Sequence, residues 1–153
     1  MEKSNTKAKV LFVCVHNSAR SQMAEAWLTY LCGDFYDVQS AGLEPGVLNP
    51  LVVEAMQEVG VDISQKKTQS VVDLLNKGLS FDYVIAVCDG ASAGRCPVFP
   101  GEAERIQWDF PDPSQLVGTK AEKLEKIRSI RDSIKARISR WCSSVPLKGC
   151  QSV

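Results

Sequence analysis

The chain has 153 residues, which is enough for one domain with a hydrophobic core and too few for two. Its 18 basic residues balance its 18 acidic residues, so the overall charge indicates neither nucleic acid nor a membrane as partner. No apolar run approaches the length of a signal-peptide core or a membrane span, and we therefore expect a cytoplasmic protein.

Apolar runs and helical periodicities alternate along the first half of the chain. Residues 10–14 form an apolar run typical of a buried strand, and a helix is expected from about Ser21, ending near Gly33. Residues 35–40 indicate a second strand. The Asn-Pro pair at 49–50 marks the start of the next helix, since asparagine caps helices and proline fits their first turn.

The second half continues the same alternation. Residues 70–77 favour a short helix. Residues 81–88 form a strongly apolar run that predicts a third strand. Residues 104–108 indicate a short fourth strand. Thr119 and Glu122 have the spacing of a capping box at the start of the last helix.

This alternation predicts both the fold class and the domain organisation. We expect a single α/β domain over residues 1–153, with a parallel sheet covered by helices on both faces. Its ordered core should span about residues 9–142. The first eight residues and the tail after residue 143 are expected to be disordered.

The most informative segment joins the first strand to the first helix. Cys14 ends the strand, and Arg20 follows six positions later, where the helix begins. The intervening residues suffice to wrap backbone N–H groups around a tetrahedral oxyanion, to which the helix N-terminus adds partial positive charge. Arg20 offers a fork of donors to the anion, and Ser21 can donate to the thiolate of Cys14, the expected nucleophile. The predicted oxyanion-binding residues are Val15, His16, Asn17, Ser18, Ala19, Arg20 and Ser21.

Residues 14–25 resemble the anion loop of the low-molecular-weight tyrosine phosphatase superfamily, and specifically of its thioredoxin-coupled arsenate reductases. Further matches, which extend the resemblance from about residue 9 to residue 141, are Ser40-Ala41-Gly42, Asn49-Pro50, Asp62-Ile63-Ser64 and Asp112-Pro113. The resemblance implies a four-stranded parallel sheet flanked by helices, with Asp112 as general acid beside the loop. Two loop positions depart from the family, since His16 replaces a usual glycine and Ala19 replaces a frequent cysteine.

The resemblance also bears on ligands near the loop. His16 either adds charge near the anion or points to solvent. Some arsenate reductases bind potassium through Asn, Glu, Ser and Asp side chains. Asn17, Glu25 and Ser40 match that set, whereas Gln69 stands where the aspartate would align. We expect no metal and no cofactor.

Reduction of arsenate to arsenite requires two electrons, which thiols must supply. Cys88 ends the predicted third strand, at the sheet edge where Cys14 ends the first. Cys96 follows a spacer with two glycines, and residues 87–100 resemble the redox segment of the reductases. We expect a Cys14–arsenic adduct, with Asp112 protonating the departing oxygen, then a Cys14–Cys88 disulfide and finally a Cys88–Cys96 disulfide.

The predicted substrate is arsenate or a phosphate-like oxyanion, and the reductant is thioredoxin, a glutaredoxin or a low-molecular-weight thiol. A monomer is expected. One alternative is a low-molecular-weight protein tyrosine phosphatase with a phosphocysteine intermediate, although Ser114 and Gln115 stand where such phosphatases tend to carry tyrosines. Another is a non-catalytic thiol sensor or arsenite-binding protein that uses the cysteines as soft ligands, which would leave Arg20 and Asp112 unexplained.

The other cysteines receive no catalytic role. Cys32 and Cys142 are expected to be free thiols that fill the core or the surface, because a reducing compartment disfavours disulfides. Cys150 lies in the tail. The sequence has one histidine and no Cys-x-x-Cys, so a zinc site is not indicated.

Overall fold

The four strands form one parallel sheet in the order β2-β1-β3-β4. The computed structural model describes residues 7–87 and 103–144. Within it, the strands are β1 (Ala8–Cys14), β2 (Tyr36–Gly42), β3 (Tyr83–Ala86) and β4 (Glu104–Gln107). The expected α/β class with four parallel strands is confirmed. Cys88 and Cys96 lie outside the described residues, as do most of the terminal residues expected to be disordered.

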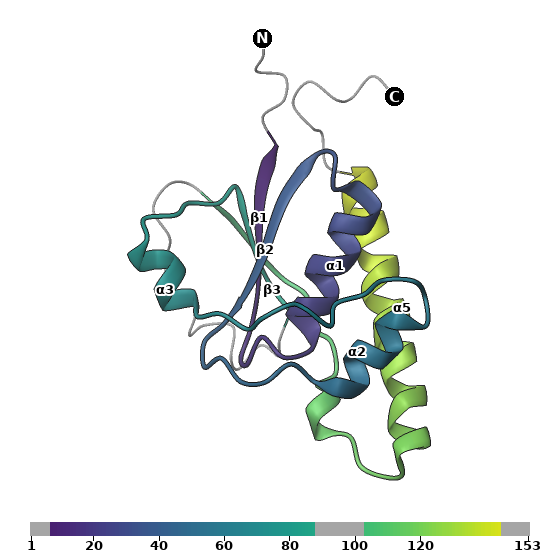
Figure 1. Cartoon of the computed structure of the whole chain (residues 1–153). Coiled ribbons are helices and arrows are strands. Elements are labelled where there is room, and N and C mark those ends of the chain that lie inside the picture. The colour runs from purple at the N-terminus through teal and green to yellow at the C-terminus, as the bar shows by residue number, and fades with distance from the viewer. Residues whose placement is uncertain (1–6, 88–102, 145–153) are drawn as a thin grey trace.

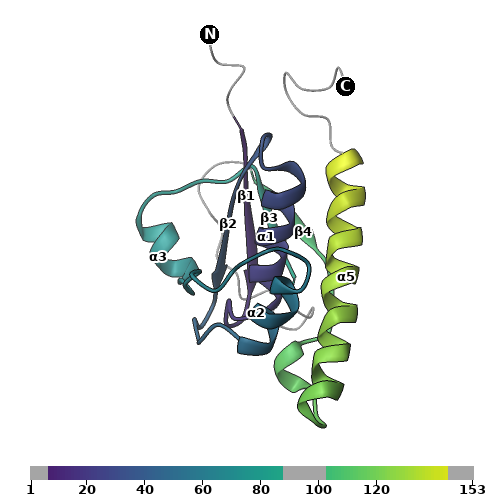
Figure 2. The same cartoon turned by 45° about the vertical axis from the view of Figure 1, so that its right-hand side comes forward.

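Helices cover both faces of this sheet. The elements are α1 (Arg20–Cys32), α2 (Pro50–Gln57), α3 (Val71–Asn76), a short 3-10 helix η2 (Pro113–Gln115) and α5 (Lys120–Ser144). α1, α2 and α5 lie on one face and α3 on the other (Figure 1), which the turned view confirms (Figure 2). In the part of the chain that the structure describes, every helix is too short or too polar to cross a membrane.

Both predicted helix starts have the expected caps. The Asn49 side chain accepts hydrogen bonds from the backbone N–H groups of Leu51 and Val52 at the start of α2. Before α5, the Glu122 carboxylate accepts from the Thr119 N–H, and the Thr119 hydroxyl accepts from the Glu122 N–H. The capping box predicted from the sequence is therefore confirmed.

The central strand β1 is buried on both sides, which explains its continuous apolar run. Val10 and Phe12 belong to the larger core cluster, together with residues of α1, α2 and α5. Leu11 and Val13 belong to the smaller cluster, which includes Leu74 of α3. Because successive strand residues point to opposite faces, β1 joins the two halves of the core.

An aromatic cluster between the sheet and α5 determines where the chain leaves β4. The Trp141 ring lies 5.4 Å from that of Tyr36, 5.1 Å from that of Tyr83 and 6.0 Å from that of Trp108, between ring centroids. Trp108, which directly follows β4, is buried and also packs on Phe12 at 6.2 Å. The connection that carries Asp112 therefore starts from a fixed point.

Cys32 and Cys142 form a disulfide across 110 positions of sequence, so the expectation that both are free thiols is wrong. α1 and α5 both run opposite to the strands, and their C-terminal ends lie together at the edge of the sheet where β1 begins (Figure 1). The expectation rested on the compartment, which says nothing about the proximity of two thiols in the fold. Cys14 ends β1 at the opposite edge, so this disulfide is remote from it.

Because of this disulfide, we expect the free energy of unfolding to depend on whether the protein is oxidised or reduced. Cys142→Ser should lower the free energy of unfolding of the oxidised protein by about 2–4 kcal/mol, because a cross-link over so long a segment restricts the unfolded chain. Urea unfolding with and without a reducing agent measures this effect. The reduced wild type should have the same free energy of unfolding as the variant. Equal stability of oxidised wild type and Cys142→Ser would contradict the cross-link.

The buried phenol of Tyr36 should make the stability of the protein depend on pH in the alkaline range. Its side chain is 2% exposed, and its hydroxyl has no hydrogen-bond partner among the described residues. Burial, together with the neighbouring Tyr83, raises the pKa of Tyr36 to about 12. In the unfolded chain the phenol ionises near pH 10, so between about pH 10 and pH 12 the folded state holds the proton more tightly and stability falls as pH rises.

Tyr36→Phe should remove the part of the stability loss at alkaline pH that this phenol causes. We expect the variant to be at least as stable as wild type at neutral pH, because it loses an unsatisfied buried hydroxyl. It should also lose less stability than wild type on going from pH 8 to pH 11, as measured by urea unfolding. An equal alkaline loss in both proteins would contradict this role of Tyr36.

Candidate active site

The loop between Cys14 and Arg20 is held from outside by the connection that follows β2. Backbone N–H groups of residues 43–49 donate to four loop carbonyls over 2.7–3.1 Å: Leu43 to Cys14, Glu44 to Val15, Gly46 to His16 and Asn49 to Ser18. In a planar trans peptide the N–H points opposite to the C=O. The next N–H groups, those of Val15, His16, Asn17 and Ala19, therefore point away from this connection, and that of Asn17 donates to the Cys14 sulfur at 3.3 Å.

Gly42, at the end of β2, makes this close packing possible. A Cβ at this position would lie 2.8 Å from the backbone nitrogen of Asn17 and the carbonyl carbon of His16. It would also lie 2.9 Å from the carbonyl oxygen of Val15. These are backbone atoms that cannot rotate away, so any side chain at position 42 would displace the loop.

Asn17 supports the loop from within. It is fully buried and has a φ of 54°, a left-handed conformation that asparagine tolerates better than most residues. Its amide nitrogen donates to the hydroxyls of Ser21 at 2.7 Å and Ser40 at 3.0 Å. Its amide oxygen accepts from the backbone N–H of Gln69 at 3.0 Å, which fixes the orientation of the amide.

Cys14 lies at the end of β1 with hydrogen-bond donors at its sulfur. The side chain is buried, and the sulfur lies 2.9 Å from the Ser21 hydroxyl oxygen. When Cys14 is a thiolate it has no hydrogen to donate, and the Ser21 hydroxyl is then the donor in this contact. The expected contact between Ser21 and Cys14 is therefore present. The Asn17 N–H and the Ser21 hydroxyl can therefore both donate to the sulfur of a Cys14 thiolate.

Arg20 and Asp112 meet beside the loop. Arg20 is the first residue of α1, and its side chain is only 6% exposed. One terminal nitrogen donates to the carbonyl oxygen of Phe110 at 3.1 Å, and the other lies 3.5 Å from the Asp112 carboxylate, whose side chain is 28% exposed. The structure thus brings the predicted anion-binding arginine and the predicted general acid together from positions 92 residues apart.

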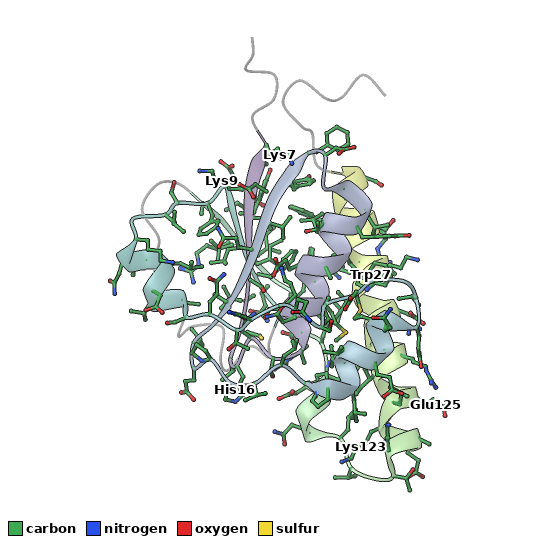
Figure 3. The ribbon with its side chains drawn as sticks, viewed as in Figure 1. Lys7, Lys9, His16, Trp27, Lys123 and Glu125 are labelled. Atoms are coloured by element: carbon green, nitrogen blue, oxygen red, sulfur yellow. A yellow bond between two sulfur atoms is a disulfide. The ribbon has the colours of Figure 1, made fainter. Side chains whose placement is uncertain are left out.

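His16 makes its contact with the outer connection. Its Nδ1 lies 2.9 Å from the Glu44 carbonyl oxygen, and the side chain is exposed. Figure 3 shows the ring at the end of the molecule where β1 ends. Of the two interpretations offered by the sequence, the geometry supports the solvent-facing one.

The other predicted site residues divide into two groups. Ser18 and Ala19 lie in the loop, and Ser21 in the first turn of α1. Cys88 and Cys96 fall outside the described residues. The residue just before Cys88 is nevertheless described, since the Val87 N–H donates to the Val13 carbonyl oxygen at 2.9 Å, alongside the end of β1.

Two residues near the loop, Gln22 and Lys66, have no predicted role from the sequence. Gln22 is fully buried, and its amide nitrogen donates to the backbone and side-chain oxygens of Asn17 and to the Lys67 carbonyl oxygen. A glutamine on the inward face of a predicted helix was a signal for such a role. Lys66 makes an ion pair with Glu25 from 41 positions away, and no local pattern indicates that pairing.

The residues that match the potassium-binding set of some relatives do not fit a cation here. The Glu25 carboxylate already pairs with the Lys66 ammonium. Gln69 directs its amide nitrogen into the same region and donates to the Ser40 carbonyl oxygen at 2.8 Å and the Gln39 side-chain oxygen at 3.3 Å. An ammonium and an amide present hydrogens where a metal ion requires oxygen lone pairs.

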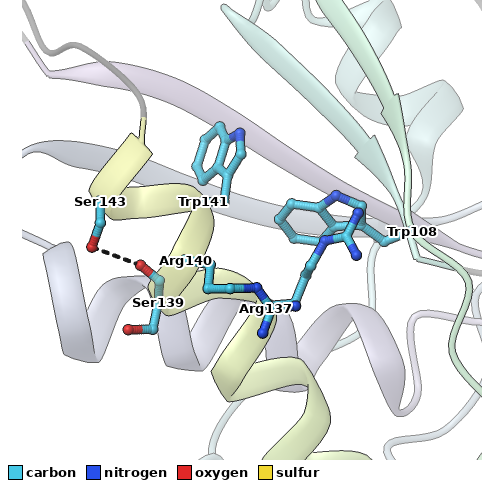
Figure 4. Close-up of a pocket in the computed structure, with 6 residues that line it drawn as sticks. All are labelled: Trp108, Arg137, Ser139, Arg140, Trp141 and Ser143. Atoms are coloured by element: carbon cyan, nitrogen blue, oxygen red, sulfur yellow. Dashed lines mark hydrogen bonds between the residues drawn. The ribbon is translucent and has the colours of Figure 1, made fainter.

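A surface hollow of about 670 Å³ lies beside the C-terminal end of α5 and is separate from the loop (Figure 4). It is lined by Trp108, Arg137, Ser139, Arg140, Trp141 and Ser143. The Arg137 guanidinium stacks over the Trp108 ring at 5.2 Å from its centroid. None of these lining residues belongs to the Cys14 loop.

Comparison with known proteins identifies the family of the chain and agrees with its fold. Residues 9–150 match the family described as low molecular weight phosphotyrosine protein phosphatase. An arsenate reductase of Halalkalibacterium halodurans is 41% identical over 139 residues, covering 90% of this chain and 97% of that protein.

Two solved structures are similar as well. An arsenate reductase in a phosphate-binding state has a TM-score of 0.72 and 30% identity, covering 91% of this chain and 99% of the other. A thioredoxin-dependent arsenate reductase of Corynebacterium glutamicum has a TM-score of 0.60 and 32% identity, covering 88% of this chain and 63% of that one. The chain therefore belongs to the low molecular weight phosphotyrosine protein phosphatase family and, within it, to the arsenate reductases.

Proposed function

We propose that the chain reduces arsenate to arsenite with Cys14 as nucleophile and Cys88 and Cys96 as the second and third thiols. The observation that carries the proposal is the cluster at the end of β1. There the Cys14 sulfur contacts the Asn17 N–H and the Ser21 hydroxyl, and the loop leads directly to Arg20. Peptide N–H groups on one side of a loop, next to a helix N-terminus and a guanidinium, match the charge and shape of a tetrahedral oxyanion.

In the first step, the Cys14 thiolate attacks arsenic and forms a sulfur–arsenic bond. One hydroxyl group of the arsenate leaves with its electron pair and takes a proton from Asp112, so that water departs. The support for Asp112 is its position within 3.5 Å of Arg20, because a group next to the anion-binding guanidinium is next to the anion. Arsenic remains in the +5 state.

In the second step, the Cys88 thiolate attacks the Cys14 sulfur. A Cys14–Cys88 disulfide forms while the sulfur–arsenic bond breaks, and its electron pair stays on arsenic, which leaves as arsenite. The Cys96 thiolate then attacks the Cys88 sulfur and releases Cys14 as a thiolate. The hydrogen bond from Val87 to Val13 supports this order, since it places the residue before Cys88 next to the strand that ends in Cys14.

The Cys88–Cys96 disulfide requires an external dithiol to complete the cycle. We propose thioredoxin, in keeping with the thioredoxin-dependent relative, ahead of a glutaredoxin or a low-molecular-weight thiol. We also propose that the enzyme acts as a monomer in the cytoplasm. The substrate class is a tetrahedral oxyanion, and phosphate binding in a similar structure suggests that aryl phosphates are hydrolysed slowly by the same loop.

Cys88→Ser tests the relay. The variant should lose arsenate-dependent NADPH oxidation in the presence of thioredoxin and thioredoxin reductase, because no thiol can then release arsenite from Cys14. It should keep its hydrolysis of an aryl phosphate, which needs only Cys14, Arg20 and Asp112. The matched control is Cys142→Ser, which removes a cysteine remote from the loop and should keep both activities.

Two results would contradict the proposal. Arsenate turnover that survives in Cys88→Ser would exclude Cys88 as the second thiol. A wild type that hydrolyses aryl phosphates but reduces no arsenate, with thioredoxin or with glutathione and glutaredoxin, would make the protein a phosphatase.

A further inference from the structure

A buried carboxylate with a lysine partner lies behind the Cys14 loop. Glu25 projects from the inward face of α1, and its side chain is 11% exposed. Its Oε2 pairs with the ammonium of Lys66, and its Oε1 accepts a hydrogen bond from the Ser40 hydroxyl at 2.6 Å. An ionised carboxylate at such a position needs a counter-charge, and Lys66 supplies it.

A preformed turn presents Lys66 to Glu25. Ile63 is buried and anchors the turn, while the Asp62 carboxylate accepts from the Ser64 N–H at 2.9 Å. The Lys66 N–H in turn donates to the Ile63 carbonyl oxygen at 3.0 Å. The ammonium is therefore directed inward by local structure, although the Lys66 side chain is 40% exposed.

From Glu25 an unbroken set of hydrogen bonds leads to the nucleophile, and the chemistry of its members fixes their direction. Because Glu25 only accepts, the Ser40 hydroxyl must donate to it, and its oxygen is then free to accept from the Asn17 amide nitrogen. The second amide hydrogen of Asn17 goes to the Ser21 oxygen. Because a Cys14 thiolate can only accept, the Ser21 hydroxyl hydrogen goes to its sulfur, 2.9 Å away.

We propose that Lys66 is a positioning residue for Cys14 and acts through Glu25, Ser40, Asn17 and Ser21. Its ammonium pairs with the Glu25 carboxylate and keeps it as a fixed acceptor at the start of the network. Without that charge, the Ser40 hydrogen loses its fixed acceptor, and the Asn17 amide loses the partner that orients it. The donor at the Cys14 sulfur is then less well placed. The inference rests on the proposed role of Cys14 as nucleophile and does not depend on Cys88 or Cys96.

Lys66→Met tests the proposal because it removes the charge and keeps the length of the side chain. We expect kcat/KM for p-nitrophenyl phosphate, and the rate at which iodoacetamide alkylates Cys14, to fall on the order of tenfold, with the unfolding midpoint little changed. Lys66→Arg keeps a cation and should retain most of both rates. The matched control is Lys120→Met, since Lys120 pairs with Glu54 on the surface at 3.4 Å and lies outside the network.

A double-mutant cycle with Ser40→Ala separates positioning through the network from a general structural effect. If Lys66 acts through Ser40, adding Lys66→Met to Ser40→Ala should cause little further loss. Additive losses, equal losses in Lys66→Met and Lys66→Arg, or an unchanged Lys66→Met would each overturn the proposal. Neither readout involves Cys88 or Cys96, so both give an answer even if arsenate reduction itself fails.

Discussion

The orientation of the peptide groups between Cys14 and Arg20 is the constraint on which the rest of the site depends. Four of their carbonyls accept hydrogen bonds from the connection after β2, which turns the N–H groups that follow them to the other side. In the proposed function, these N–H groups bind the tetrahedral anion together with Arg20. Gly42 is part of the same constraint, because its missing side chain lets the loop pack against the end of β2.

A second layer of contacts, made by buried side chains, holds this loop from within the protein. Asn17 adopts a left-handed conformation that its own side-chain hydrogen bonds stabilise, to Ser21, Ser40 and Gln69. Glu25 and Lys66 extend this layer to the surface. The positive charge beside the Glu25 carboxylate is the ammonium of Lys66.

The sequence predicted those features that depend on local patterns. The apolar run before Cys14 predicted β1, the Asn-Pro pair predicted the start of α2, and the capping box predicted the start of α5, because each involves residues within one element. The spacing of Cys14 and Arg20 predicted a loop between a strand and a helix, and the structure has this loop. The third strand, expected over residues 81–88, has the narrower assignment Tyr83–Ala86 in the described residues.

Features that depend on the meeting of distant segments were not predictable in this way. The Cys32–Cys142 disulfide and the Lys66–Glu25 ion pair join residues 110 and 41 positions apart, and neither partner carries a local signal for the other. The same holds for the Phe110 carbonyl that holds Arg20, since a backbone oxygen has no sequence signature. The pairing of Arg20 with Asp112 was expected only through the family resemblance.

The most direct test of the central claim is a phosphate titration of the reduced, ¹⁵N-labelled wild type, followed through its backbone amide resonances. Phosphate is a tetrahedral oxyanion that the thiols do not reduce, so it reports binding alone. The account predicts that the amides of Val15, His16, Asn17 and Ala19 shift together and saturate with one dissociation constant. Unmoved loop amides, or largest shifts in residues around the hollow beside Trp108 and Arg137, would contradict it.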